Sequence, residues 1–491
     1  LFRMKKQIKY ILAICLVLIT GISCKKEYLV SVPLTSVSDA TAFDTPERIL
    51  GNVRSLYSNT KAGTFYAGRY IVYGDIRGED FLNETGNLVT GADVWSLNPT
   101  GTSTNSVINL WAQAYFTINL CNITIEGVTA KGPTVVGATL SNNYLGEARL
   151  IRALCYYSLL QFYARPYADG AGSKPGLPLR LTAIKGPGSS DMARSTVAQV
   201  YAQIISDLNF AEANLPATNA SAELNTTRAH KNTAIALKTR VFLSMGDYPN
   251  VITEATKLVP QATAPFSATS GVLHALQPNI ATVFSTYNTT ESILSFPMTA
   301  ASGDNPGTQN PLGFYFLRNA TNPGSAEYSL NPSGIIGDAG WGAADVRKTS
   351  LIFTNVTNSK KFVNKYTLPS PFLDYPPVIR YSEVLLNLAE ALARTNTTVN
   401  AKALALVNAV RQRSDASVTI TAATQAALIN AIMLERRIEF LGEGLRNNDL
   451  MRLLQTIPAK GSVPAKAPTD QGYIWPISAN EMSLNKLMTD N

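Results

Sequence analysis

Hydrophobic residues recur with the 3.6-residue period of an amphipathic helix in four regions of the chain. In the first region Trp111, Tyr115 and Ile118 share one helical face, and a second helix follows until Pro166 ends it. The other three regions span about 195–216, 232–259 and 378–455. We therefore predict a mainly α protein whose helical frame covers about 105–260 and 378–455.

Residues 232–259 predict two helices joined by a tight turn at Gly246, Asp247 and Tyr248. A glycine and an aromatic residue at the turn are typical of tetratricopeptide-like helical hairpins. Hairpins that follow one another closely along a chain usually stack into a right-handed array. The frame is therefore expected to consist of stacked helical hairpins.

Three further regions, about 60–104, 261–376 and 456–491, are rich in glycine, proline, asparagine, serine and threonine. This texture predicts an irregular, loop-rich part containing short strands. Loops of this length inside a compact protein are usually functional. A rigid helical frame that carries such loops is typical of a binding protein.

Residues 1–23 predict a lipoprotein signal peptide. Four lysine or arginine residues precede an apolar run, residues 10–20, that is too short to span a bilayer. Cys24 follows at the cleavage position, so we expect diacylglycerol and an acyl chain such as palmitate to anchor the mature chain, residues 24–491. Lys25, Lys26 and Glu27 would form a hydrophilic tether. An ordinary cleaved signal with a coincidental cysteine is the alternative.

The charge balance argues against nucleic acid as a partner. Loss of the four basic residues of the signal lowers the formal net charge from +8 to +4, and no block of lysines and arginines remains. Besides Cys24, the mature chain has Cys121 and Cys155, both in apolar helical patterns where free buried thiols are common. The sequence leaves a disulfide between these two cysteines open.

Several segments, in order along nearly the whole chain, resemble those of the SusD/RagB-like outer-membrane lipoproteins. The most specific are RYSEVLLNLAEAL at 380–392 and ERRIEFLGEGLRNNDLMR at 435–452. Weaker matches are SCKKEYLVSVP at 23–33, the W-x3-Y-x2-I-x3-N pattern at 111–122, GEARLIRALCYYSLLQFY at 146–163, KPGLPLR at 174–180, STVAQVYAQIISDL at 195–208, ALKTRVFLSMGDY at 236–248 and YIWPIS at 473–478.

This resemblance implies a SusD-like fold: helical, tetratricopeptide-like hairpins with an irregular, loop-rich part. It also implies a lipid anchor in the outer membrane and exposure at the cell surface. The implied work is to capture an oligosaccharide or polysaccharide for a partner SusC-like TonB-dependent outer-membrane transporter. A structural lid of the transporter that binds no sugar itself is a second hypothesis. We expect no cofactor.

Segment 435–452 is the strongest candidate for catalysis. Glu435, Glu439 and Glu443 repeat every four residues along one helical face, and a pair of carboxylates is the machinery of a glycosidase. Arginines crowd the same segment, and alternating acids and arginines hold helices together through bidentate ion pairs. We interpret the glutamates as structural, and a glycan-degrading enzyme is the less favoured alternative.

Metal chemistry has little support in the sequence. The chain has two histidines, His230 and His274, which are isolated from one another along the sequence. The zinc-protease, phosphate-loop and dinucleotide motifs are absent from the sequence. We interpret both histidines as surface or turn residues and expect no metal site.

Sugar recognition requires aromatic faces for pyranose C–H groups and amide or guanidinium groups for hydroxyls. Trp111 and Trp475 are interpreted as core residues. Trp95 lies in a loop-like segment and Trp341 among glycines and alanines, where each is either a plug in an irregular core or an exposed platform. The predicted ligand site consists of Arg77, Trp95 and Asn98, approached from the middle loop region by Trp341 and by Tyr315 or Tyr328. The alternative for Arg77 is an ion pair with Asp75, Glu79 or Asp80.

Overall fold

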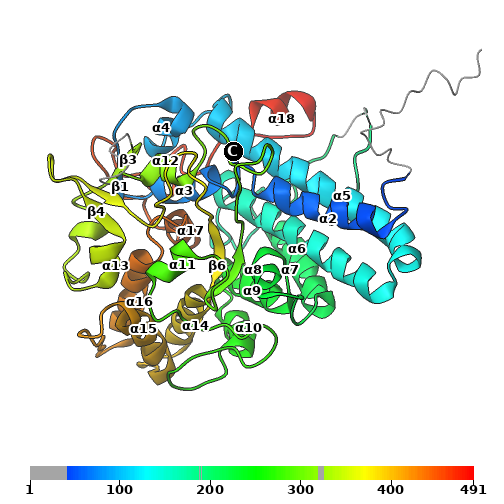
Figure 1. Cartoon of the computed structure of the whole chain (residues 1–491). Coiled ribbons are helices and arrows are strands. Elements are labelled where there is room, and N and C mark those ends of the chain that lie inside the picture. Colours follow the sequence, from blue (N-terminus) through cyan, green and yellow to red (C-terminus); the bar gives the residue numbers. More distant parts are fainter. Residues whose placement is uncertain (1–40, 187, 189–190, 319–325) are drawn as a thin grey trace, which may run out of the picture.

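The computed structural model describes residues 41–186, 188, 191–318 and 326–491 (Figure 1). Cys24 and the predicted signal peptide lie outside the described residues. Long helices occupy the right and lower parts of Figure 1, and short strands and helices occupy the upper left. The chain is helical with a loop-rich part, as predicted.

The long helices and one short companion fall in the predicted regions, except the first, which lies before them and was not predicted. They are α2 (Pro46–Thr60), α5 (Asn109–Val135), α6 (Ala138–Tyr163), α7 (Val197–Asn214), α9 (Lys231–Met245), α10 (Tyr248–Leu258), α14 (Tyr381–Thr395), α15 (Ala401–Ser414), α16 (Gln425–Glu439) and α17 (Arg446–Arg452). The shorter helical segments are α3 (Arg69–Ile76), η3 (Leu88–Thr90), α4 (Ala92–Trp95), η4 (Thr104–Ile108), α8 (Ala222–Thr227), α11 (Ala281–Ser285), α12 (Leu312–Phe316), η5 (Ile335–Gly337), α13 (Val346–Ser350) and α18 (Ala479–Leu484).

Neighbouring frame helices pack on one another in chain order. Helix α5 packs on α6, α6 on α7, and α7 on α9. Helix α9 packs on α10, and α10 packs on α14. Helix α14 also contacts α15 and α16. The α9–α10 turn forms because Gly246 ends α9 with a left-handed φ of 71° and the Asp247 side chain accepts the Asn250 N–H to cap α10. The predicted helical hairpin is confirmed.

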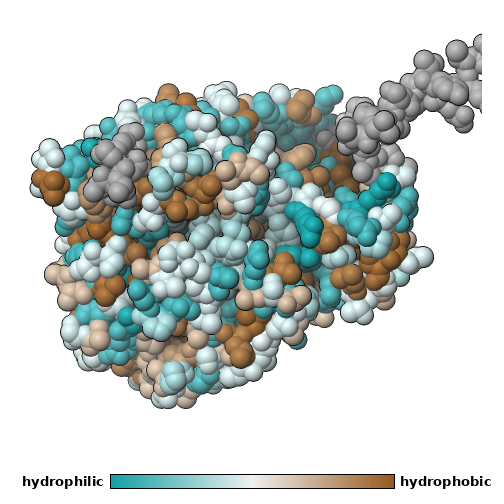
Figure 2. All heavy atoms as spheres, in the orientation of Figure 1, coloured by the Kyte–Doolittle hydropathy of each residue, from teal (hydrophilic) through white to brown (hydrophobic). Residues whose placement is uncertain are grey.

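The strands of the described residues form three two-stranded antiparallel sheets. The pairs are β1 (Phe81–Asn83) with β3 (Tyr328–Leu330), β2 (Ser292–Ser295) with β6 (Pro377–Arg380), and β4 (Ile352–Thr354) with β5 (Lys361–Val363). The β1–β3 pair joins the first loop region to the middle one. Over this loop-rich part of the view, Figure 2 shows hydrophobic residues in small groups among hydrophilic ones.

Helix α3 falls within a region predicted as loop. All eight of its residues are buried. A helix buried on every side has no polar face, so the amphipathic period that identifies a surface helix is missing from its sequence.

The described residues also show the state of two cysteines and whether any helix is of membrane-spanning type. Cys121 on α5 and Cys155 on α6 are free, buried thiols, so they are not bridged. Among the described residues, no helix combines the length and the apolar character needed to cross a bilayer.

Candidate functional site

The glutamates of segment 435–452 belong to a buried network of ion pairs. Arg347 bridges Glu435 at 2.5 Å and Glu439 at 2.8 Å, and Arg380 contacts both Glu439 and Glu443. The whole network has five acids and five bases: Glu291, Asp345, Glu435, Glu439, Glu443, Arg347, Lys365, Arg380, Arg411 and Arg413.

Charge pairing decides the ionisation of these carboxylates. Burial alone would raise the pKa of Glu439, but the charges of Arg413, Arg380 and Arg347 hold that pKa well below its ordinary value. Because the three glutamates are buried and engaged by basic side chains, they are not presented to a substrate. The structural interpretation of the three glutamates agrees with this geometry.

His230 and His274 are buried, so their interpretation as surface or turn residues was wrong. Their rings stack with centroids 5.4 Å apart, and His274 Nδ1 lies 3.1 Å from the Thr290 carbonyl oxygen. His230 sits at the start of α9 in the polar run RAHKN, which resembles an exposed turn in sequence. The described residues contain no group of three or more histidine, cysteine or acidic side chains that could hold a metal ion.

Arg77 is buried, with 1% of its surface exposed, and so cannot reach a glycan in solution. Its guanidinium donates to the Asn447 side-chain oxygen at 2.6 Å and to the Tyr473 carbonyl at 2.5 Å. These bonds tie α3 to α17 and to the C-terminal loop. The alternative ion pair is also not formed among the described residues. Glu79 and Asp80 pair with Arg437 and Arg446, and Asp75 accepts the Gly444 N–H.

The tryptophans are mainly packing residues. Trp111 and Trp475 are core residues, as predicted, and Trp341 is only 2% exposed, so it is a plug and not a platform. Lys348 lies over the Trp341 ring and donates to its carbonyl at 2.7 Å. Trp95 is half-buried, packs against the core, and donates from its indole N–H to the Phe81 carbonyl at 2.8 Å.

Asn98 is exposed and lines the largest of the described clefts, which encloses about 590 Å³. We call it the Asn98 cleft, and its lining comprises Leu97, Asn98, Pro99, Thr100, Gly101, Arg165, Asp470, Gln471, Gly472, Tyr473, Ile474, Pro476, Asp490 and Asn491. Its one aromatic residue, Tyr473, is buried beneath the Arg165 guanidinium, 5.2 Å from the ring centroid. The Asn98 cleft therefore offers polar groups but no aromatic face.

A smaller pocket, of about 320 Å³, does present aromatic rings. We call it the aromatic pocket, and it is lined by Ala300, Asn305, Gly307, Thr308, Gln309, Pro311, Phe314, Ser370, Pro371 and Phe372. Phe314 and Phe372 are half-buried, with ring centroids 6.2 Å apart and planes at 84°. The side chains of Thr308, Gln309 and Ser370 make no hydrogen bond to the described residues, and the lining includes no charged side chain.

The backbone around the aromatic pocket is strained. Gln309 and Phe372 both have a φ of 58°, the left-handed region that costs a non-glycine residue about 1–3 kcal/mol. Phe372 lies tightly against α12, because a Cβ at Gly313 would come within 2.8 Å of its ring. Strain of this kind concentrates at binding and active sites.

Tyr315 and Tyr328, both predicted to touch ligand, are fully buried instead. Tyr315 nevertheless supports the aromatic pocket, because its hydroxyl donates to the Gln309 carbonyl at 2.9 Å. Tyr328 stacks on Tyr315 at 6.3 Å and donates to the Thr90 carbonyl at 2.9 Å. The two tyrosines therefore position the pocket wall from behind.

A buried carboxylate holds the second wall. Asp374 accepts the Thr367 N–H at 2.9 Å and the Leu368 N–H at 3.2 Å, which fixes the loop leading to Phe372. Burial raises the pKa of Asp374 to about 6.

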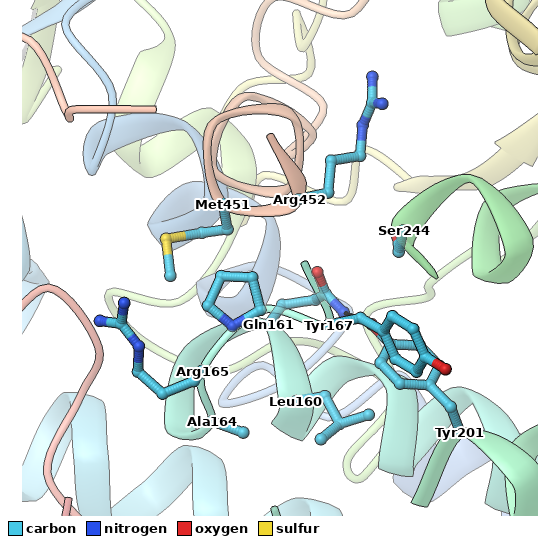
Figure 3. A pocket seen from close by; sticks show the side chains of 10 residues that line it. Leu160, Gln161, Ala164, Arg165, Tyr167, Tyr201, Ser244, Met451 and Arg452 are labelled. Atoms are coloured by element: carbon cyan, nitrogen blue, oxygen red, sulfur yellow. Dashed lines mark hydrogen bonds between the residues drawn. The ribbon is translucent and has the colours of Figure 1, made fainter. Parts of the chain in front are cut away.

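Figure 3 shows a third pocket, at the junction of α6, α7, α9 and α17. Arg165 and Arg452 lie on opposite sides of it, and the Tyr167 and Tyr201 rings meet edge-on at 5.6 Å. Its volume of about 10 Å³ is at the lower limit for holding a single water molecule. It is too small for a sugar.

Comparison with known proteins identifies the family. Residues 36–243 match the family model described as "Starch-binding associating with outer membrane", and residues 356–462 match the SusD family model. A crystal structure of a SusD superfamily protein from Bacteroides fragilis is 30% identical, with a TM-score of 0.79 over 91% of this chain and 100% of that chain. The chain belongs to the SusD family.

Other relatives of this SusD-family protein are more distant. A SusD-like protein of Formosa agariphila is 22% identical, covering 94% of this chain and 93% of its own length. A laminarin-binding SusD-like protein shares the SusD fold with a TM-score of 0.70 at 20% identity, covering 91% of this chain and 99% of that chain. The family inferred from the motifs is confirmed.

Sequence reasoning missed Phe314 and Phe372. Each lies in the loop-rich middle region beside glycine or proline, in the stretches NPLGFYF and PSPFLDY. An aromatic residue beside glycine or proline in a loop-rich region is a usable signal for a sugar platform, and phenylalanine carries it as tryptophan and tyrosine do.

Proposed function

We propose that this protein captures glycan at the cell surface, in the aromatic pocket, and delivers it to a partner TonB-dependent outer-membrane transporter. One observation carries the proposal: two half-buried aromatic rings line a pocket without charged side chains, in which the side chains of Thr308, Gln309 and Ser370 make no hydrogen bond to the described residues. The outer-membrane association of the matched family and the laminarin-binding relative support it.

Stacking should supply most of the binding energy. Covering about 60 Å² of apolar surface at one ring is worth about 1.5 kcal/mol, at about 25 cal/mol per Å². A hydrogen bond to a sugar hydroxyl only replaces one to water and gains about 0.5–1.5 kcal/mol. Loss of one ring should therefore weaken binding about tenfold, and loss of both about a hundredfold.

Affinity gels followed by calorimetry against a glycan panel that includes laminarin and starch test this proposal. Phe314→Ala and Phe372→Ala should each weaken binding of whichever glycan the wild type retains. Phe116→Ala is the matched control, because Phe116 on α5 is 52% exposed and far from the pocket in sequence. Unchanged affinity in both pocket variants would refute the assignment of the site.

The same panel separates the alternatives. A transporter lid without sugar binding would bind no glycan but would still co-purify with the transporter. A glycan-degrading enzyme would raise the reducing-end concentration during overnight incubation. We expect bound glycan and constant reducing ends.

We further propose that Cys24 carries the lipid anchor. Its place after a basic and then apolar leader, in a chain of this family, supports the assignment. Detergent phase partition should move wild type to the detergent phase and Cys24→Ala to the aqueous phase. An Ala variant that remains in the detergent phase would exclude Cys24 as the anchor.

A further inference from the structure

A fourth cavity, a cleft of about 310 Å³, adjoins the aromatic pocket. Asp304 lines this cleft and the next residue, Asn305, lines the aromatic pocket, so one loop separates the two. We call it the basic cleft, and its lining comprises Arg54, Tyr57, Ser58, Lys61, Leu224, Thr227, Arg228, Ser295, Phe296, Pro297 and Asp304. It lies between the C-terminal half of α2, helix α8 and the end of β2.

The basic cleft has more positive than negative side chains, because three bases and one acid line it. Arg228 is neutralised by Glu147 behind the wall, through bonds of 3.0 and 2.5 Å. Lys61 pairs with Asp304 at 2.5 Å. Arg54 is exposed and makes no ion pair or hydrogen bond to the described residues, so its charge is left uncompensated at the rim.

An unpaired hydroxyl lies deeper in the same cleft. Ser295 has none of its surface exposed, and its Oγ has no hydrogen-bond partner among the described residues. Buried polar groups are normally paired, so an unpaired one in a cleft wall calls for a ligand atom. The floor is apolar, formed by the edge-to-face pair Tyr57 and Phe296 with ring centroids 6.4 Å apart.

We propose that the basic cleft binds an anionic group, a carboxylate or a sulfate ester, on the glycan whose pyranose rings stack in the aromatic pocket. This inference rests on the proposed function and names its substrate class. The Arg54 guanidinium can form a fork of two parallel bonds to either group. The Ser295 hydroxyl is closed to solvent in this structure, so it donates a third bond only when the cleft wall opens. The apolar floor suits the C–H face of the sugar that carries the charge.

The position of the two sites favours one ligand across both. Because consecutive residues of a single loop line the two walls, a short oligosaccharide can contact both pockets. A neutral glucan would leave the Arg54 charge and the Ser295 hydroxyl without partners. The arrangement therefore favours an acidic glycan over a neutral one.

The experiment compares three oligosaccharides of equal length by calorimetry: a neutral laminarin fragment, a polyuronate fragment and a sulfated galactan fragment. The variants are Arg54→Gln and Ser295→Ala, with Arg48→Gln as control because Arg48 is an exposed arginine on the same helix. We expect at least one acidic fragment to bind tenfold or more tightly than the neutral one. Arg54→Gln should remove that advantage, and added salt should reduce it. The two acidic arms tell carboxylate from sulfate.

Each outcome has a distinct meaning. If acidic fragments bind no more tightly than the neutral fragment, the proposal for the basic cleft alone is overturned. The same holds if they bind Arg54→Gln with the affinity that they show for Arg48→Gln. Neutral binding that depends on Phe314 and Phe372 would survive such a result. Failure of every fragment to bind would instead count against the proposed function and, with it, against this site.

Discussion

The buried pair of His230 and His274 predicts a loss of stability in acid. The chain has two histidines, so the effect can be assigned to them. Burial, together with the neighbouring His274 ring, lowers the pKa of His230 to about 3, and burial lowers the pKa of His274 to about 4. At pH 5 both are neutral in the folded chain, whereas an unperturbed pKa of about 6.5 makes them mostly protonated in the unfolded chain.

The sign follows from proton linkage. From about pH 7.5 upward neither state binds much proton at these sites, so the pair contributes almost no pH dependence there. Below that pH the unfolded state binds more protons, and stability falls until the folded pKa values near 4 and 3 are reached. Between pH 7.5 and 5 each histidine accounts for about 2 kcal/mol of lost unfolding free energy, and the pair for about 4 kcal/mol.

The assay is urea unfolding at several pH values, followed by tryptophan fluorescence, on protein without a histidine tag. The comparison is between wild type and the double variant His230→Gln/His274→Gln, in which neutral amides replace the imidazoles. We expect the wild type to lose about 4 kcal/mol more than the double variant between pH 7.5 and 5. Parallel profiles, or a histidine NMR titration with midpoints near pH 6.5, would refute the reasoning.

Three further substitutions test the packing described above. Glu439→Gln should lower the free energy of unfolding by about 3–5 kcal/mol in denaturant titration, because it leaves buried arginines uncompensated; a negligible loss would mean that the ion-pair network is not needed. In wild type the raised pKa of Asp374 should lower the free energy of unfolding by about 1.4 kcal/mol as the pH rises from 5 to 7.5. Asp374→Asn should remove this pH-dependent loss, and an unchanged loss in the variant would contradict the raised pKa. Trp341→Ala should lower the free energy of unfolding by about 3–5 kcal/mol, because it truncates a core side chain. An unchanged melting temperature would mean that Trp341 is an exposed platform and not a core residue.

The helical frame could be predicted because its elements carry their own signals. In the α9–α10 hairpin, Gly246 and Asp247 provide the turn and the cap locally. Helix α3 carries no such signal, because burial on all sides removes the polar face. The burial of His230 could not be predicted because its sequence neighbours are polar. The sequence does not show that the β2 region packs against the start of α9.

The proposed ligand site was harder to predict, because its residues meet through long-range contacts. Trp95, at the end of α4, and Asn98 are three residues apart, yet the structure turns one against the core and the other towards solvent. Phe314 and Phe372 lie far apart in the chain, and no spacing rule brings them together. The family motifs identified the fold from residues of the frame and the ion-pair network, which do not line the aromatic pocket.

The central proposal is that glycan binds in the aromatic pocket, on the accessible faces of Phe314 and Phe372. Its most direct test is a crystal structure of the protein with a retained oligosaccharide. We predict pyranose rings stacked on these two phenylalanines, with sugar hydroxyls bonded to the Gln309 amide. Sugar confined to the Asn98 cleft, with the aromatic pocket unoccupied, would contradict the account.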